Sequence, residues 1–295
     1  MHSEKENISV AMATFNGADY IREQIISILA QDTKPIEIII VDDASNDSTM
    51  DILQNLAIKH SIIKIHINEI NLGHVAAFKQ AVSKCTGRYI ALSDQDDIWE
   101  RNKLTLTLRH LSRIESDDIP CMVYSDLSMM TSSGYKLRSS FWRYYKLRPH
   151  KCRFYSLFFG NMITGCTTLF NRSMAIELLS MPENILMHDH WMGLIAYGFG
   201  KAIALKTPLV RYRCHDKSVT VKKRLNLLMR SLALFKELQQ HGCYLENHIV
   251  QAKIFYEVYG NKLSIFKKRE VQRFIQLGAY RSLTQLIYLK FNRWY

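Results

Sequence analysis

Three carboxylates lie within four positions of this sequence, directly after a short apolar run. Asp94, Asp96 and Asp97 follow residues 89–92, which predict a buried strand. Carboxylates this close repel one another unless a cation or hydrogen-bond donors lie among them. An Asp-x-Asp sequence that ends a strand can hold a divalent metal ion, and a metal ion that carries a diphosphate indicates transfer from an activated nucleotide donor. The alternative is an acidic turn in which Asp97 caps a helix that begins near Glu100.

A second acidic cluster, residues 42–49, follows the β-branched run 36–41, which predicts a buried parallel strand. Ligands of open α/β sheets bind at the carboxyl ends of the strands. A solvated loop, with Asp47 or Ser48 capping the next helix, accounts for most of this cluster. It does not account for Asp42, which lies at the strand terminus, where a base or ribose could be bound.

Apolar patterning places both clusters in a series of strands and helices. Four strand-then-helix units in the first ~115 residues predict an α/β fold with a mainly parallel, right-handed, doubly wound sheet. The carboxyl ends of its strands would bring the acidic clusters to one edge. The expected strands are residues 8–13, 36–41, 62–67 and 89–93. The expected helices are residues 20–30, 50–59 and 75–85, with a fourth helix that begins near Glu100.

Four ordered motifs together resemble family 2 glycosyltransferases with the GT-A fold. They are residues 10–17, 41–49, 71–73 and 92–97, and the resemblance covers roughly residues 7–216. The Asp-Gln-Asp-Asp-Ile-Trp sequence and a later His-Asp-x-Trp are most similar to bacterial enzymes of lipopolysaccharide and capsule assembly, many of them rhamnosyltransferases.

The resemblance implies a donor site and a metal ion. Asp42 would hydrogen-bond a pyrimidine base, Asp94 would lie near the ribose, and Asp96 would hold Mg²⁺ or Mn²⁺ against the diphosphate. His215 could reach the metal ion or the diphosphate, or could be structural. The donor-binding residues implied are Thr14, Asn16, Asp42, Asp94, Asp96 and Arg213, and the metal ligands are Asp96 and His215.

The resemblance also implies a catalytic base, since inverting transfer needs a group that deprotonates the acceptor hydroxyl. Asp189 matches the position of that base. The pair His188 and His190 would also permit a structural zinc ion, although acceptor-site or packing roles are favoured. The acceptor-binding residues implied are Gly165, Asp97, His188 and Trp191.

Two segments of the chain are rich in positive charge. Residues 139–159 are basic and aromatic, and could form a mobile acceptor loop, a membrane-surface patch or ordinary packing. From Val221 to Tyr295 there are 14 Lys and Arg against 4 Asp and Glu, so this segment carries +10 of the chain's net +12. Basic amphipathic helices there favour an anionic membrane surface. A helical cap, a homodimer contact and nucleic acid are the alternatives, and no nucleic-acid-binding module accompanies the charge.

The remaining features bound the organisation. We expect a catalytic domain over residues 1–216 and a basic helical region over residues 217–295. Six cysteines without Cys-x-x-Cys spacing, a polar N-terminus and no run of about 18 or more apolar residues predict a cytoplasmic protein, peripheral on the inner face of the cytoplasmic membrane.

These features together predict an inverting, metal-dependent transferase. The donor would be dTDP-rhamnose or a UDP-hexose, and the acceptor a lipid-linked, lipopolysaccharide or capsule glycan. A dinucleotide-dependent oxidoreductase is excluded, because no Gly-x-Gly-x-x-Gly turn follows the first strand. The alternative within the same fold is a catalytically inert scaffold that binds nucleotide sugars or membranes.

Overall fold

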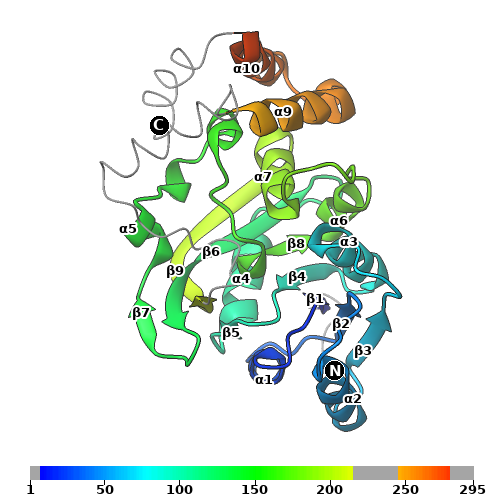
Figure 1. Cartoon of the computed structure of the whole chain (residues 1–295). Helices are drawn as coiled ribbons and strands as arrows, with labels where there is room; N and C mark the ends of the chain where they lie inside the picture. Colours follow the sequence, from blue (N-terminus) through cyan, green and yellow to red (C-terminus); the bar gives the residue numbers. More distant parts are fainter. Residues whose placement is uncertain (1–6, 215–244, 280–295) are drawn as a thin grey trace, which may run out of the picture.

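A single nine-stranded sheet runs through the protein, in the order β3-β2-β1-β4-β8-β6-β9-β5, with β7 paired to β6 (Figure 1). The computed structural model describes residues 7–214 and 245–279. The strands are β1 (Ile8–Thr14), β2 (Glu37–Asp42), β3 (Ile63–Ile67), β4 (Tyr89–Ser93), β5 (Ile98–Trp99), β6 (Cys121–Thr131), β7 (Lys136–Arg138), β8 (Leu169–Asn171) and β9 (Lys201–Cys214).

The first four strands are parallel, as predicted. β1 pairs with β2 and with β4, and β2 pairs with β3, all in parallel register. Every residue of β2 is buried, which explains its unbroken β-branched sequence. The connecting helices are α1 (Ile21–Leu29), α2 (Thr49–Lys59) and α3 (His74–Lys84). The carboxyl ends of these strands lie at one edge of the sheet and support the acidic loops.

The second half of the sheet is mixed. The short strand β8 runs antiparallel to both β4 and β6, whereas β9 runs parallel to β6. β5 follows β4 and pairs with β9, so the expected helix near Glu100 begins only at Lys103. Asn102, and not Asp97, is its N-terminal boundary residue, which corrects the predicted capping role of Asp97. The helices here are α4 (Lys103–Leu111), α5 (Phe141–Tyr145), α6 (Arg172–Leu179) and α7 (His188–Gly198), with 3₁₀ turns η2 (Pro149–Lys151), η3 (Phe154–Phe159) and η4 (Gly165–Thr167).

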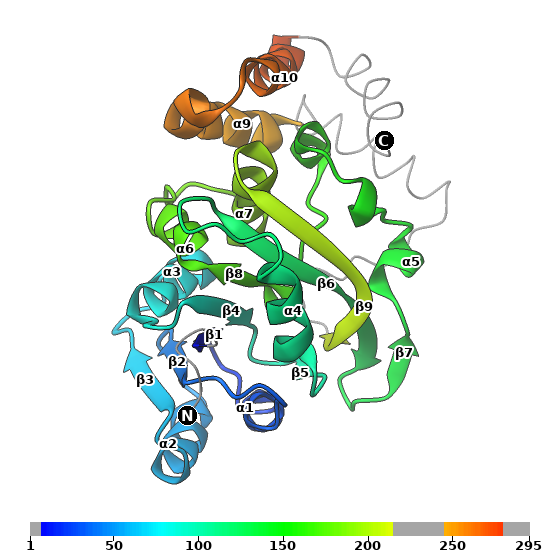
Figure 2. The same ribbon diagram turned by 180° about the vertical axis from the view of Figure 1, so that it is seen from behind.

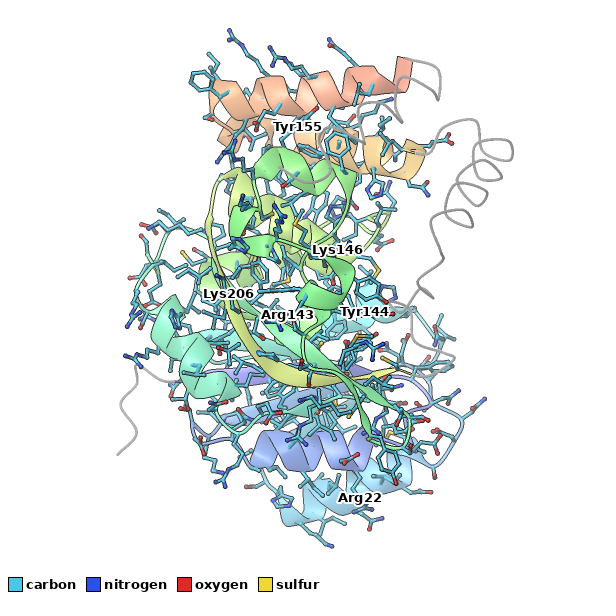
Figure 3. All side chains as sticks on the ribbon, turned by 90° about the vertical axis from the view of Figure 1, so that its left-hand side faces the viewer. Arg22, Arg143, Tyr144, Lys146, Tyr155 and Lys206 are labelled. Carbon is cyan, nitrogen blue, oxygen red and sulfur yellow. The ribbon has the colours of Figure 1, made fainter. Side chains whose placement is uncertain are left out.

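The segment from β7 to η3 lies along one side of the molecule, at the left of Figure 1. The same side faces the viewer in Figure 3, where Arg143 and Tyr144 lie on α5, Lys146 directly follows α5, and Tyr155 lies above them. Of this segment, Phe141 is buried. The segment is therefore a packed part of the catalytic body.

Two C-terminal helices, α9 (Glu246–Tyr259) and α10 (Ile265–Gln276), stack beyond α7 at the top of Figures 1 and 2, joined by η5 (Gly260–Lys262) and followed by η6 (Leu277–Ala279). The Phe274 ring stacks on Phe158 with 5.1 Å between centroids. Phe255 meets the indole of Trp191 edge-on at 5.3 Å. One hydrophobic cluster therefore joins these helices to the sheet.

The division at residue 216 stays a prediction, since the basic segment after it is described only over residues 245–279. The apolar positions expected on its first helix, from Leu225 to Phe235, lie outside the described residues. Within residues 7–214 and 245–279, no helix is long and apolar enough to cross a membrane.

Candidate active site

Acidic side chains crowd the loop after β4. Asp94, Asp97 and Cys166 each place one potential ligand atom within 4.8 Å of the others. Burial, followed by the charges of Asp96 and Asp189, raises the pKa of Asp94 to about 7. Burial and the charge of Asp96 also raise the pKa of Asp97 well above its usual value. A cation placed among these groups would relieve both shifts.

A buried lysine lies beneath the loop. Lys103 has no exposed surface, and its Nζ lies 3.3 Å from the ring centroid of Trp99. Nζ has no hydrogen-bond partner among the described residues, and the same is true of Oδ2 of Asp97. Burial lowers the pKa of Lys103 to about 7. Buried polar atoms without partners cost free energy, and groups with shifted pKa values gather at functional sites.

The donor set at this loop fits a hard divalent cation. Asp94 and Asp96 are partly exposed carboxylates at the strand end, and carboxylate oxygens suit Mg²⁺ or Mn²⁺. Cys166 is fully buried, and burial beside Asp97 and Asp94 raises the pKa of its thiol well above the ordinary value. A protonated thiol is a poor ligand, so the carboxylates are the ligands that this site offers.

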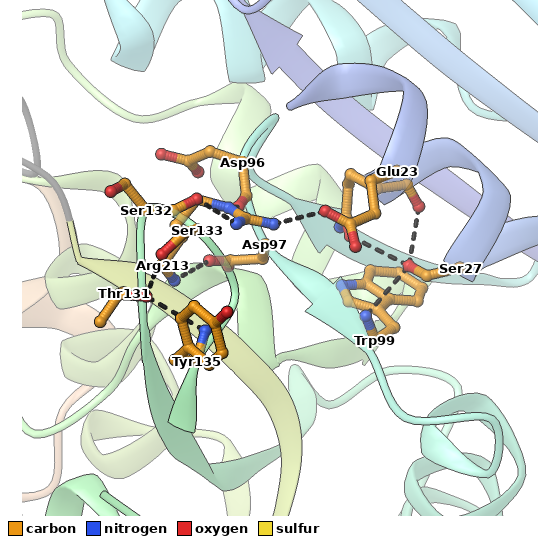
Figure 4. A network of polar contacts seen from close by, with 11 residues as sticks. Glu23, Ser27, Asp96, Asp97, Trp99, Thr131, Ser132, Ser133, Tyr135 and Arg213 are labelled. Carbon is orange, nitrogen blue, oxygen red and sulfur yellow. Dashed lines mark hydrogen bonds and ion pairs between the residues drawn. The ribbon is translucent and has the colours of Figure 1, made fainter. Parts of the chain in front are cut away.

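Arg213 braces the loop from the side of β9 (Figure 4). Its guanidinium donates to the carbonyl oxygen of Asp96 (2.8 Å), to the carbonyl oxygen of Ser132 (2.7 Å) and to a carboxylate oxygen of Glu23 (2.6 Å). Its backbone N–H donates to Oδ1 of Asp97 (3.2 Å). The side chain is 2% exposed. In this structure Arg213 therefore fixes the position of the loop, and its contact with the donor stays a prediction.

The loop after β1 is hydrogen-bonded at the same edge to the loop after β4 and to the loop after β2. Thr14 donates its hydroxyl to Oε1 of Gln95 (2.6 Å), and the N–H of Phe15 donates to the same oxygen (2.8 Å). Asn16, at a left-handed φ of 50°, accepts from the N–H of Asn46 (2.9 Å).

Asp42 is buried beneath the loop that follows β2. Its two oxygens accept from the N–H (2.9 Å) and the hydroxyl (2.6 Å) of Ser45. In this structure Asp42 braces its own loop. Of the two residues predicted in the loop after β1, Thr14 is 3% exposed and Asn16 is partly exposed. Asn16 is therefore the more accessible to a ligand.

Asp189 lies in the first turn of α7. Its carboxylate accepts from the side-chain amide of Asn161 (2.9 Å) and from the N–H groups of Gly165 (3.2 Å) and His190 (2.7 Å). Burial outweighs these hydrogen bonds and raises the pKa of Asp189 to about 6. Because the charge of Asp189 acts on Asp94, the two carboxylates belong to one site. A carboxylate with a raised pKa is a stronger base toward a hydroxyl.

The residues that flank Asp189 point in different directions, because successive side chains on a helix diverge by about 100°. The His188 ring packs against Phe78 with 4.5 Å between centroids, and its nitrogens have no partner among the described residues. A Cβ at Gly165 would lie 2.8 Å from Nε2 of His188, so only glycine fits there. His188 and Gly165 are therefore packed closely against each other beside Asp189.

His190 and Trp191 belong to the core. Nε2 of His190 lies 2.6 Å from the carbonyl oxygen of Leu157, and Nδ1 lies 2.8 Å from the amide nitrogen of Gln251. Trp191 has no exposed surface, so its predicted contact with the acceptor is wrong for this structure. Among the described residues the one three-ligand cluster is at Asp94, which gives the zinc interpretation of the histidines no support.

Several participants were not predicted from the sequence. Gln95 lies between two predicted residues, and Asn161 lies four positions before the predicted Gly165, so proximity along the chain was a signal for both. Glu23, Lys103 and Cys166 reach the loop from distant elements and carry no motif. His215 lies outside the described residues.

Comparison with known proteins places this arrangement in a family. The sequence model of glycosyl transferase family 2 matches residues 9–179. The glycosyltransferase TuaG of Bacillus subtilis, named for teichuronic acid biosynthesis, is 29% identical over 225 residues, covering 76% of this chain and 85% of TuaG. The glycosyltransferase EpsH of the same organism is 27% identical, covering 94% of this chain and 76% of EpsH.

Solved structures show the same fold. TarS of S. aureus in complex with UDP-GlcNAc superposes with a TM-score of 0.56 at 16% identity, covering 92% of this chain and 81% of that one. The mannosyltransferase PcManGT of Pyrobaculum calidifontis, in complex with GDP-Man and Mn²⁺, gives a TM-score of 0.52 at 17% identity, covering 96% of this chain and 78% of that one.

Proposed function

The chain belongs to glycosyl transferase family 2, and on that premise we propose that it moves a sugar, with inversion, from a nucleotide diphosphate to a glycan hydroxyl. The observation that carries this proposal is the presence of two acidic groups, one suited to a cation and the other suited to accepting a proton. The loop after β4 holds crowded carboxylates that a cation would stabilise, and Asp189 is a buried carboxylate whose pKa is raised to about 6. One group suits the leaving diphosphate and the other the attacking hydroxyl.

The residues act in sequence. Asp189 accepts the proton of the acceptor hydroxyl, whose oxygen attacks the anomeric carbon as the bond to the diphosphate oxygen breaks. Asn161 and Gly165 hold the Asp189 carboxylate in place through their hydrogen bonds. Asp96, with Asp94, would hold Mg²⁺ or Mn²⁺, which offsets the charge that develops on the leaving diphosphate. Arg213 keeps Asp96 and Asp97 positioned.

The donor is proposed from the relatives. TarS is solved with UDP-GlcNAc and PcManGT with GDP-Man and Mn²⁺, which supports a nucleotide-diphosphate sugar and a divalent metal ion for this chain. The similarity of residues 94–99 to rhamnosyltransferases adds dTDP-rhamnose to the UDP-hexoses as a candidate donor. Asn16 and the backbone near Phe15 are placed to meet the nucleotide.

The acceptor is proposed to be a lipid-linked or cell-surface glycan, as in lipopolysaccharide or capsule assembly. The relative TuaG, named for teichuronic acid biosynthesis, supports a surface polysaccharide. His188 and Gly165, which lie beside Asp189, would contact this acceptor.

The outer face of α10 supports peripheral attachment to the inner face of the cytoplasmic membrane, where lipid-linked acceptors are found. Ile265 is 64% exposed and Phe266 is 75% exposed, and Lys267, Lys268 and Arg269 follow them directly. Apolar side chains beside cations suit an anionic bilayer surface. A homodimer contact through the same face is the competing arrangement.

Two measurements test these proposals. Thermal unfolding with Mn²⁺ and a panel of nucleotide sugars should show stabilisation by one donor class that depends on the metal ion. No stabilisation by any nucleotide sugar would contradict the transferase proposal.

Membrane attachment is tested by vesicle binding. Phe266→Ser should weaken binding to vesicles rich in phosphatidylglycerol, whereas Ile58→Ser, at an 85% exposed position on α2, should not. Equal binding of both variants would contradict attachment through α10.

A further inference from the structure

The segment from β7 to the start of η3, residues 136–153, carries positive charge that nothing in the proposed reaction uses. We call this segment the basic ridge. It has seven Lys and Arg and no Asp or Glu. All seven side chains are exposed, and none forms an ion pair with a described carboxylate. They are Lys136, Arg138, Arg143, Lys146, Arg148, Lys151 and Arg153.

The ridge is anchored from its inner side. The carboxylate of Asp126, at 3% exposure, accepts from the hydroxyl of Ser140 and from the N–H of Trp142 (3.1 Å). The indole of Trp142 is buried and meets Tyr124 edge-on at 5.9 Å. The polar and aromatic anchors therefore point inward, and the cations are left on the outer face, as Figure 3 shows for Arg143 and Lys146.

On each side of the ridge, a residue a few positions along the chain contacts the active site. Before it, the carbonyl oxygen of Ser132 accepts from Arg213, which also holds the Asp96 carbonyl. After it, Asn161 donates to the carboxylate of Asp189 (2.9 Å). The ridge therefore lies, along the chain, between one segment that contacts the donor loop and another that contacts the base.

We propose that the basic ridge binds the acceptor, and that this acceptor is a polyanionic glycan. This inference rests on the proposed transferase function and names its acceptor class. Cations spaced along a surface complement a chain of repeated anionic sugars. Tyr135, directly before the ridge, is 76% exposed, and the Arg138 guanidinium lies 5.1 Å from the centroid of the half-buried Tyr144 ring. Tyrosine presents both an apolar face and a hydroxyl, which suits a sugar chain.

A bilayer is the less favoured partner for the ridge. Leu137, at 40% exposure, is its one large aliphatic side chain that stands out to solvent, whereas α10 exposes both Ile265 and Phe266. Insertion into a bilayer needs apolar area, and the ridge offers mainly charge.

The test compares two triple variants of the full chain. Arg143→Gln, Lys146→Gln and Arg148→Gln remove three charges from the ridge, and Lys59→Gln, Lys84→Gln and Arg113→Gln remove three exposed charges elsewhere. Polygalacturonate oligomers serve as the anionic probe, and maltooligosaccharides of equal length serve as the neutral one. Binding of polygalacturonate should weaken on the order of tenfold in the ridge variant at low salt, and not in the control variant.

Three results would overturn the proposal. They are no binding of polygalacturonate by the unmodified chain, equal affinity of the two triple variants for polygalacturonate, and a ridge variant that loses binding to phosphatidylglycerol vesicles but keeps binding to polygalacturonate. Donor binding is measured on the same preparations with Mn²⁺ and the nucleotide sugar, and should be equal in both variants. Absence of donor binding by the unmodified chain would contradict the transferase proposal alone, since it does not bear on glycan binding.

Discussion

Two acidic loops at the same edge of the sheet differ in how their carboxylates are satisfied. After β2, Asp43 accepts from Asn68 (2.8 Å) and from the N–H groups of Leu72 (2.9 Å) and Gly73 (2.8 Å). After β4, Asp97 accepts from one N–H, and its other oxygen is buried without a described partner.

The difference shows which acidic cluster has a structural role and which has a chemical one. A carboxylate that accepts several backbone N–H groups fixes a loop, and deleting it leaves those donors unpaired. A buried carboxylate beside other carboxylates has a raised pKa and is stabilised only when a cation or proton arrives. We therefore infer that the loop after β2 is a structural brace, and we propose that the loop after β4 is a binding site completed by a cation.

The largest effect is expected at the base. Asp189→Asn keeps the shape of the side chain and removes its capacity to accept a proton, so transfer should fall about 100- to 10,000-fold. Donor affinity should be unchanged, and both quantities can be measured on one preparation. Near-normal turnover would mean that another group deprotonates the acceptor.

The next effect concerns the metal ion. Asp96→Ala should abolish the Mn²⁺-dependent part of nucleotide-diphosphate binding, because it removes a carboxylate ligand of the proposed metal ion. Calorimetry with Mn²⁺ and UDP measures this. Asp51→Ala, at an exposed position on α2, is the control and should bind normally. Unchanged affinity in Asp96→Ala would remove the metal assignment.

The contrast between structural and chemical side chains extends to His190, the buried histidine that follows the base. His190→Leu leaves the Leu157 carbonyl and the Gln251 amide without their partner, so the free energy of unfolding should fall by about 2 kcal/mol. His60→Leu, at an exposed position, should change it little. Urea unfolding gives both values, and equal stability of the two variants would contradict a structural role for His190.

A smaller effect is expected from pH. The pKa of Asp189 is about 6, so the transfer rate should fall roughly tenfold per pH unit below that value as the base becomes protonated. Protonation of Asp189 itself favours the folded state, because its folded pKa lies above the unfolded one. The buried neutral His190, with a pKa of about 4, acts oppositely, and stability is lost as pH falls from about 6.5 toward 4.

Thermal unfolding at each pH therefore separates loss of the base from loss of the fold. A transfer rate that stays constant from pH 7 to pH 5, while the protein stays folded, would show that Asp189 does not titrate in the reaction.

The parallel half of the sheet could be predicted because each of its strands has an apolar run long enough to recognise. β5 has two residues and β8 has three, and strands this short carry no pattern of their own. Their pairing with β9 and β6 decides that the second half is mixed. Tertiary pairing of that kind cannot be read from local sequence.

The acidic residues of the site could be predicted because three of them are close together in the sequence. The residues that surround them in the structure come from distant parts of the chain. Lys103 and Cys166 lie under the loop through the packing of α4 and η4, and Arg213 arrives from β9. Trp191 shows the reverse error, since it is two residues from Asp189 in the sequence and turns into the core on the helix. Proximity along the chain therefore predicted loop neighbours well and helix neighbours poorly.

The contrast between the two acidic loops is tested most directly by the unfolding free energies of Asp43→Asn and Asp97→Asn, measured side by side in urea without metal ions. Asp43→Asn places an amide among N–H donors and should destabilise the protein by about 1 to 3 kcal/mol. Asp97→Asn keeps the oxygen that accepts from Arg213 and removes a buried charge, so stability should be unchanged or higher. An equal loss of stability in both variants would contradict the assignment of the loop after β4 as a binding site.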